Sequence, residues 1–230
     1  MHWFFDEEFT QDSTRVSPHE LQHFRSLRIK QNEEIAVTNG RGSVFYCRTL
    51  SPDQGEVEVH KTESQPPVLP RIHLVQALAK GDRDEQALQM AVELGVASVT
   101  PWQAEHSIVN WSEKAERNRQ RWQEIANAAM KQSHQAHQVK VETISKTLDL
   151  RPRGKGIVLD PTAQFPISSL DKQTQELTLV VGPEGGFGAK EIQQLNEQGF
   201  ESYRLGPSIL RTSTAGPAAI AAILALTGRW

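Results

Sequence analysis

The first third of the chain carries short apolar runs that predict a small β domain. Three runs have the length and the β-branched and aromatic content of strands: 34–38, 43–50 and 56–60. Asn39-Gly40 separates the first two and is a strong signal for a tight turn between paired strands. Pro18 suits the first turn of a short helix over 18–25. We therefore expect a small barrel-like domain with one helix.

The remaining two thirds alternate between strand-like and helix-like segments. A proline-rich stretch, 64–70, reads as an extended linker before this region. The segments in chain order are strand 72–77, helix 82–94, strand 97–101, helix 112–132, strands 140–143, 156–160 and 177–182, helix 189–199, strand 202–205 and helix 218–227. Such alternation is typical of a parallel α/β sheet. We expect two domains, 1–68 and 71–230, with any ligand of the second at the carboxyl ends of its strands.

Composition limits the partners and the compartment. The formal net charge of −3 provides no overall basic field, so nucleic-acid binding would depend on local patches. The single cysteine, Cys47, excludes an internal disulfide framework and fits a reducing compartment. No apolar run approaches a membrane span, and the start MHWFFDEEF lacks the features of a signal peptide. These features predict a soluble cytoplasmic protein without a membrane partner.

The stretch 178–188, TLVVGPEGGFG, predicts a buried strand that ends in a ligand-binding glycine loop. Glycines permit close approach of a ligand to the backbone and adopt φ angles that other residues avoid. The loop contains an acid, Glu184, and lacks the Gly-Lys-Ser/Thr of a phosphate-binding P-loop. The GxGxxG dinucleotide pattern does not fit either. The expected ligand is therefore not rich in phosphate.

A second signal follows at 205–217, where Arg211 lies between apolar residues and a cluster of hydroxyls. The hydroxyls open the predicted terminal helix, and Pro217 suits its first turn. One interpretation of this segment is a helix N-cap with a surface cation. The other is a second loop of the same ligand site.

Together the two segments resemble the RsmE-type RNA methyltransferases of the SPOUT superfamily. That family has a GPEGG(F/L) loop and an LG.RILRTETA segment, which match 182–187 and 205–215. Further similar segments extend the resemblance over nearly the whole chain; they are 23–29, 78–83, 91–96, 105–107 and 128–133.

The resemblance implies a SPOUT-type knotted parallel sheet domain that forms a homodimer, preceded by a PUA-like RNA-binding β-barrel. It also implies S-adenosyl-L-methionine (SAM) as cofactor and methylation of N3 of a uridine in 16S ribosomal RNA of the small ribosomal subunit.

Site residues follow from the same match. Arg211 is the expected catalytic residue, and Arg25, Arg28, Lys80 and Arg83 are expected to bind RNA. The expected cofactor-binding residues are Leu159, Asp160, Pro161, Gly182, Pro183, Glu184, Gly185, Gly186, Leu205, Gly206, Ile209, Leu210, Thr212, Thr214 and Ala215.

Several charged positions depart from the family pattern. Ser213 replaces a glutamate, Ser208 and His106 each replace an arginine, Met90 replaces a lysine, and Lys131 stands where an acid is usual. Two alternatives therefore stay open. One is a non-catalytic RNA-binding or ribosome-assembly factor of the same fold, and the other is a methyltransferase with a different RNA target, such as tRNA.

One competing motif is present. His19-Glu20-Leu21-Gln22-His23 is a literal HExxH, the signature of zinc proteases. It falls in the first turn of a short helix and has no obvious third ligand. We interpret it as a surface helix with Ser17 as N-cap and expect no metal there.

Overall fold

A computed structural model describes all 230 residues, which form two compact units. The first unit comprises Met1–Pro67 and Met130–Gln138, and the second comprises Val68–Ala129 and Val139–Trp230. The sequence pattern did not assign residues 130–138 to the first unit. Independent domains with boundaries 1–68 and 71–230 stay a prediction.

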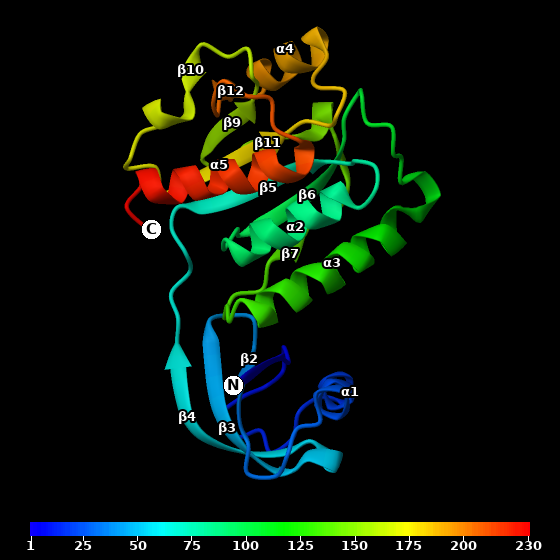
Figure 1. Cartoon of the computed structure of the whole chain (residues 1–230), viewed down its shortest axis with the longest axis vertical. Helices are drawn as coiled ribbons and strands as arrows, with labels where there is room; N and C mark the ends of the chain where they lie inside the picture. Colours follow the sequence, from blue (N-terminus) through cyan, green and yellow to red (C-terminus); the bar gives the residue numbers. More distant parts are fainter. The chain divides into compact units, whose positions relative to one another are not determined.

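The first unit contains a four-stranded sheet (Figure 1). The strands β1 (His2–Phe5), β2 (Glu34–Thr38), β3 (Ser43–Ser51) and β4 (Glu56–Ser64) lie in this order; β1 is parallel to β2, and the other pairs are antiparallel. The edge strands β1 and β4 do not pair, so the sheet is open and the predicted barrel is not confirmed. Helix α1 (Pro18–Leu27) and the 3-10 turn η1 (Pro52–Gln54) complete the main elements.

The predicted turn between β2 and β3 is confirmed. The side-chain oxygen Oδ1 of Asn39 accepts hydrogen bonds from the backbone N–H groups of Arg41 at 2.9 Å and Ser43 at 3.3 Å. Gly40 has a φ of +72°, and a Cβ at this position would lie 2.7 Å from the ring of Phe5. The turn therefore requires glycine for both its conformation and its packing.

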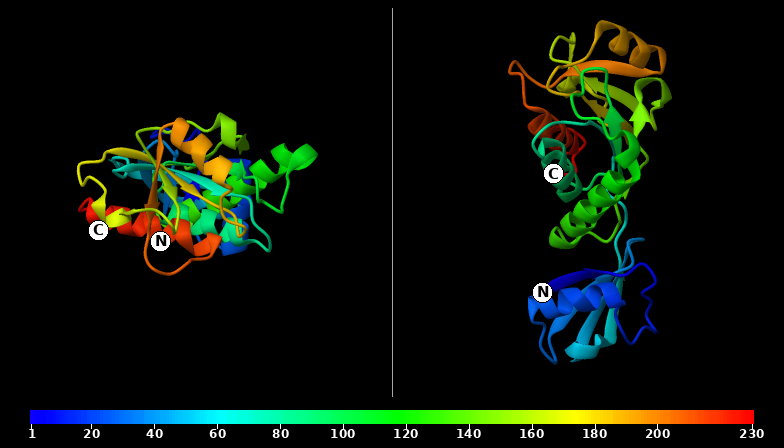
Figure 2. Two further views of the ribbon diagram at one scale, coloured as in Figure 1. Left: turned by 90° about the horizontal axis from the view of Figure 1, so that it is seen from above. Right: turned by 90° about the vertical axis from the view of Figure 1, so that its right-hand side faces the viewer.

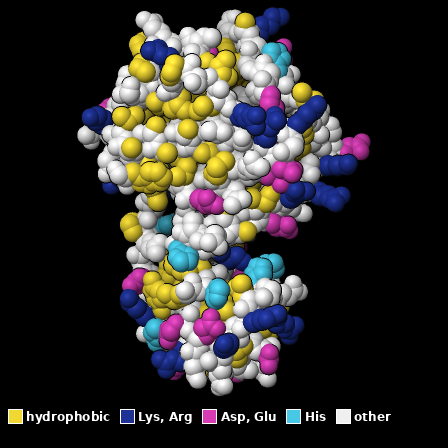
Figure 3. All heavy atoms as spheres, in the orientation of Figure 1, with side chains coloured by type: hydrophobic (Ala, Val, Ile, Leu, Met, Phe, Trp, Pro, Cys, Tyr) yellow, Lys and Arg dark blue, Asp and Glu magenta, His cyan; other side chains and the backbone are white.

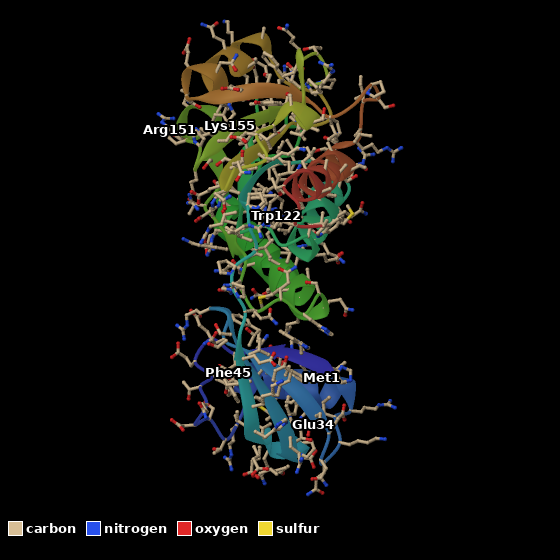
Figure 4. All side chains as sticks on the ribbon, turned by 90° about the vertical axis from the view of Figure 1, so that its left-hand side faces the viewer. Met1, Glu34, Phe45, Trp122, Arg151 and Lys155 are labelled. Atoms are coloured by element: carbon tan, nitrogen blue, oxygen red, sulfur yellow. The ribbon has the colours of Figure 1, made fainter.

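Aromatic and aliphatic side chains from α1 and the sheet fill the core of the first unit. Phe24 and Phe45 are buried in this core, and Figure 4 labels Phe45 within the sheet. These two rings are therefore not available to stack on a nucleic-acid base. Cys47 lies in the same core, where burial raises the pKa of its thiol to about 12. The single cysteine is thus a packing residue and not a nucleophile.

The segment 130–138 is held against the sheet of the first unit. The carbonyl of Ala136 accepts hydrogen bonds from the Thr38 hydroxyl at 3.0 Å and from the Gly42 N–H at 2.9 Å. The ring of His134 stacks on Trp3 with 5.1 Å between the centroids. Contacts across about a hundred positions of sequence thus make this segment part of the unit.

The second unit contains a parallel sheet, as predicted. Its path runs β10-β12-β9-β11-β5-β6-β7, with β8 also paired to β6, and every pair is parallel. The strands are β5 (Arg71–Ala77), β6 (Ser98–Gln103), β7 (Lys140–Val141), β8 (Ser145–Lys146), β9 (Lys155–Leu159), β10 (Phe165–Pro166), β11 (Glu176–Val181) and β12 (Phe200–Arg204). The helices are α2 (Arg83–Glu93), α3 (Ala115–Gln132), α4 (Ala189–Glu197) and α5 (Thr212–Leu226), with 3-10 turns η2 (Ser112–Lys114), η3 (Thr147–Asp149) and η4 (Ile167–Ser169).

Helices cover both faces of this sheet. α2 and α5 pack against each other on one face (Figure 2), and α4 contributes Leu195 to the core on the other face, where it meets Trp102 and Phe200. Trp122 of α3 is buried edge-on against Trp111, with 5.0 Å between the ring centroids (Figure 4). None of the helices combines the length and apolar character that a membrane crossing requires.

Helix α5 begins six residues earlier than predicted, at Thr212, and Pro217 lies inside it. The preference of proline for a first turn suggested a later start, which is wrong. The hydroxyl of Thr212 donates to the carbonyl of Gly182 at 2.9 Å and accepts from Nε2 of Gln76 at 3.0 Å. These contacts with the ends of β11 and β5 place the first turn of α5 at Thr212. Local sequence signals do not encode such contacts between distant segments.

Candidate functional site

A cavity of about 310 Å³ lies where β9, β11 and β12 end. Three segments line it: 159–161 after β9, 181–187 after β11, and 205–215 between β12 and the first turn of α5. This is the edge of a parallel α/β sheet at which ligands commonly bind. Apolar side chains form most of its walls, and its charged side chains are Asp160, Glu184 and Arg211.

The cavity brings together most of the expected cofactor-binding residues, although their role stays a prediction. Thirteen of the fifteen line it: Leu159, Asp160, Pro161, Gly182, Pro183, Glu184, Gly186, Leu205, Gly206, Ile209, Leu210, Thr212 and Ala215. Gly185 and Thr214 are not among the lining residues. Arg211 does line the cavity, together with three residues that sequence reasoning did not single out as ligands: Val181, Phe187 and Ser208.

Gly185 and Gly186 occupy the loop for different structural reasons. Gly186 has a φ of +68°, and a Cβ there would meet nothing within 4 Å. A side chain at this position would therefore enter free space beside the cavity that Gly186 lines. A Cβ on Gly185 would instead lie 2.8 Å from Cβ of His106, so Gly185 is required by protein packing. In the sequence, His106 stands out only as the replacement of an arginine; in the structure its Nδ1 lies 3.1 Å from the Gly185 carbonyl oxygen.

Thr212 lines the cavity, but its hydroxyl is already occupied. It donates to Gly182 and accepts from Gln76, so it joins the end of β11 to the start of α5. Gln76 is fully buried. No periodicity identifies Gln76 as part of the site, because β5 is buried on both faces from Ile72 to Ala77 and its pattern does not separate one face from the other. The pair fixes two walls of the cavity relative to each other.

Arg211 directly precedes α5 and is exposed. Its carbonyl accepts the first hydrogen bonds of the helix, from the N–H groups of Thr214 and Ala215. Its guanidinium has no hydrogen bond or ion pair in the structure. Arg211 thus caps α5 through its backbone carbonyl and also places a free cation on the cavity wall. The segment can therefore be both a helix N-cap and a second loop of the ligand site.

The expected RNA-binding residues fall in two places. Arg25 and Arg28 lie exposed at the carboxyl end of α1 in the first unit. Lys80 and Arg83 lie in the second unit at the start of α2, where Arg83 forms an ion pair with Glu184 at 3.0 Å. The second pair therefore adjoins the glycine loop, an arrangement that the sequence did not indicate.

The HExxH motif forms a buried ion pair. Ser17 caps α1 as predicted, because its hydroxyl accepts from the Glu20 N–H at 3.4 Å. Glu20 itself is only 1% exposed, so the prediction of a surface helix is wrong at this residue. Nζ of Lys131 lies 2.9 Å from both Oε1 of Glu20 and Nδ1 of His23. The ammonium thus competes with any divalent cation for the same atoms.

Replacing Lys131 with methionine is expected to destabilise the protein. It would leave the Glu20 carboxylate buried without a counter-charge, which typically costs about 3–5 kcal/mol. Urea unfolding measures the change in the free energy of unfolding. The double variant Glu20→Gln with Lys131→Met is the control and is expected to regain most of the loss. A Lys131→Met protein as stable as the wild type would contradict the structural role of this pair.

The comparisons with known proteins agree with this geometry. The model of an RNA methyltransferase domain matches residues 65–224. The chain is 32% identical to ribosomal RNA small subunit methyltransferase E of Mycobacterium bovis over 88% of this chain and 82% of the relative. It is 31% identical to the protein of that name from Aquifex aeolicus over 94% and 95%. The crystal structure of the Neisseria gonorrhoeae protein of that name, bound to S-adenosyl methionine, superposes with a TM-score of 0.89 over 98% of both chains at 32% identity. The chain belongs to the ribosomal RNA small subunit methyltransferase E family.

Proposed function

We propose that this protein is a SAM-dependent methyltransferase that modifies N3 of a uridine in 16S ribosomal RNA of the small subunit. One observation carries the proposal. The two motif segments that define the family resemblance line one cavity, in which Arg211 is the one cationic residue. The names of the relatives, and the cofactor bound by the Neisseria gonorrhoeae protein, support the reaction class and the substrate.

The cavity residues fit SAM. Its apolar walls suit the faces of adenine, while Asp160 supplies a carboxylate for polar groups. Gly186 and Gly206 line the cavity, and a Cβ on either would project into open space, which leaves room for a ligand against the backbone. When bound, SAM supplies a methyl group already activated on a sulfonium. The main task of the protein is then to position the acceptor.

The acceptor chemistry assigns a role to Arg211. N3 of uridine lies on the Watson–Crick edge, so the base must be unpaired or flipped out to react. It is also protonated at neutral pH, and loss of the proton leaves negative charge on the ring. A guanidinium that donates a hydrogen bond to a uracil oxygen stabilises such charge as it develops. With Ser213 in place of the family's acid, the Arg211 guanidinium forms no ion pair that would compete with the substrate.

Methyl transfer from labelled SAM to deproteinised small subunits, followed by mapping of the modified nucleotide, tests the proposal. Label on N3 of a uridine in 16S RNA is the expected result. Label that appears only on tRNA would identify a different RNA target. Binding of SAM and RNA without transfer of label would identify a non-catalytic assembly factor.

We further propose that the first unit, PUA-like by resemblance, binds RNA through Arg25 and Arg28. Both side chains are exposed, whereas the aromatic Phe24, which directly precedes Arg25, is buried, so the contact rests on charge and not on stacking. Arg25→Ala combined with Arg28→Ala is expected to weaken RNA binding. The slope of log affinity against log salt should fall by about one per lost phosphate contact, while SAM affinity stays constant.

Binding of a short ribosomal RNA fragment at several salt concentrations measures this effect. Arg15→Ala with Arg48→Ala is the matched control, because it removes the same charge from the same unit at arginines already paired with Glu56 and Glu34. Equal salt slopes for the two double variants would show that Arg25 and Arg28 are ordinary surface residues that do not contact RNA.

The homodimer and the knotted chain path are also proposals that follow from the resemblance, and the cytoplasmic location is a proposal that follows from the composition. For the dimer, support comes from the apolar surface around α5, which Figure 3 shows as a concentration of hydrophobic side chains on the second unit. Ile209 is 84% exposed beside this helix. Exposed apolar surface of this kind commonly marks an interface. Sedimentation equilibrium tests it, and a monomer at micromolar concentration would exclude a stable dimer.

A further inference from the structure

Glu184 is fixed by two donors from one short segment. Its Oε1 accepts a hydrogen bond from Nη1 of Arg83 at 3.0 Å and from the backbone N–H of Lys80 at 3.3 Å. Glu184 belongs to the glycine loop and lines the cavity. The start of α2 therefore holds one wall of the cavity by a carboxylate.

The segment that provides these donors is itself fixed. Gly81 and Asp82 both adopt left-handed backbone angles, with φ of +63° and +59°, which turn the chain sharply between Lys80 and Arg83. Asp84 is buried, and its carboxylate accepts from the N–H of Ala79 at 3.0 Å. The turn therefore presents a backbone N–H and a guanidinium to the same oxygen.

The glycine loop gains order from this carboxylate in addition to the contact between Gly185 and His106. Within it, the Gly186 N–H bonds to the Pro183 carbonyl at 3.0 Å, and Glu184 and Gly185 occupy the two positions between them. Two adjacent glycines permit many backbone conformations, and ordering them costs conformational entropy. A carboxylate held by two donors from outside the loop restricts that freedom before a ligand arrives.

We propose that Arg83 is a positioning residue for the cofactor loop, which it holds through Glu184, and that it is not primarily an RNA contact. The assignment rests on the proposed function, because it takes the cavity to be the SAM site. It also reverses the sequence-based expectation for Arg83. The guanidinium that the motif suggested for RNA is already engaged by a carboxylate of the pocket.

Calorimetry with S-adenosylhomocysteine on Arg83→Met, Glu184→Gln and the double variant tests the proposal. Loss of a hydrogen bond to a charged group is expected to weaken binding about tenfold in Arg83→Met. The double variant should bind S-adenosylhomocysteine no more weakly than the weaker of the two single variants, because each single variant already removes the same Arg83–Glu184 interaction. Binding of a ribosomal RNA fragment should change less than twofold in Arg83→Met.

Arg121→Met is the matched control, because Arg121 also forms an ion pair with a carboxylate, Glu85 at 2.8 Å, but Glu85, unlike Glu184, does not line the cavity. Its affinity for S-adenosylhomocysteine should equal that of the wild type. If Arg83→Met keeps normal ligand affinity and loses RNA affinity, the proposal is overturned and Arg83 is an RNA contact. If the wild type itself does not bind S-adenosylhomocysteine, the proposed cofactor is wrong, which is a separate failure.

Discussion

Replacing Gly186 with valine is expected to abolish binding of S-adenosylhomocysteine while the protein still unfolds cooperatively. Gly186 lines the cavity and has a φ of +68°, and the space that its Cβ would enter is empty of protein atoms. A branched side chain would therefore compete with the ligand for that space and strain the loop. We expect affinity to fall by at least about a hundredfold, or about 2.7 kcal/mol. Titration calorimetry measures it.

A matched control separates loss of space from backbone strain. Gly228 also has a positive φ, +72°, and a Cβ there would likewise meet nothing within 4 Å, but this residue does not line the cavity. Gly228→Val should therefore lose some stability and keep its ligand affinity. Gly206→Ala adds only a methyl group inside the cavity at a φ outside the left-handed region, and an intermediate loss is expected. Normal affinity in Gly186→Val would place the cofactor elsewhere.

The local sequence pattern was sufficient to predict the strands that are buried on both faces. The run Leu179–Val181 is continuously apolar and leads into Gly182, and it lies in β11 at the centre of the parallel sheet, paired with β5 and β9. β1 was missed because its four residues, His2–Phe5, have no turn signal before them. Its pairing with β2 depends on residues more than thirty positions away. Local periodicity does not contain such information.

Interactions between distant residues also explain the errors at the helices. The start of α5 is set by Thr212 and Gln76, which are 136 positions apart. The burial of Glu20 depends on Lys131, 111 positions away. The sequence around Glu20 is typical of the first turn of a surface helix. Only the ammonium of Lys131 offsets the cost of burying the Glu20 carboxylate.

For the site, motif resemblance identified the loops that line the cavity but not the direction in which each of their residues points. Thr214 and Gly185 belong to the same motifs as their neighbours, yet neither lines the cavity. Thr214 is exposed on the first turn of α5, and Gly185 faces His106. Phe187 was absent from the expected ligands although it lines the cavity. In an irregular loop, no fixed period relates sequence position to the side that a residue presents.

Replacing Arg211 with lysine is expected to slow methyl transfer by about a hundredfold or more, with little change in affinity for S-adenosylhomocysteine. Lysine keeps the positive charge but loses the rigid, planar N–H donors with which a guanidinium can hold a uracil oxygen as charge develops on it. Loss of one preorganised donor to a developing anion typically costs about a hundredfold to a thousandfold in rate. Arg211→Ala should be slower still. Single-turnover measurement with saturating cofactor and RNA isolates the chemical step from binding and release.

The control for Arg211 is Arg204→Lys. Arg204 is an arginine of β12 in the same unit, but its guanidinium donates to the backbone carbonyls of Ala163 and Gln164 and does not line the cavity. That variant should transfer the methyl group at nearly the wild-type rate even if its stability falls. A bracing role for Arg211 would show as equal losses of stability in the two variants, together with normal single-turnover rates. Normal rates in both Arg211→Lys and Arg211→Ala would exclude the catalytic role. We expect reduced rates in both variants, because the Arg211 guanidinium lies at the cavity wall and forms no ion pair. A cation that only braced the loop would contact the loop.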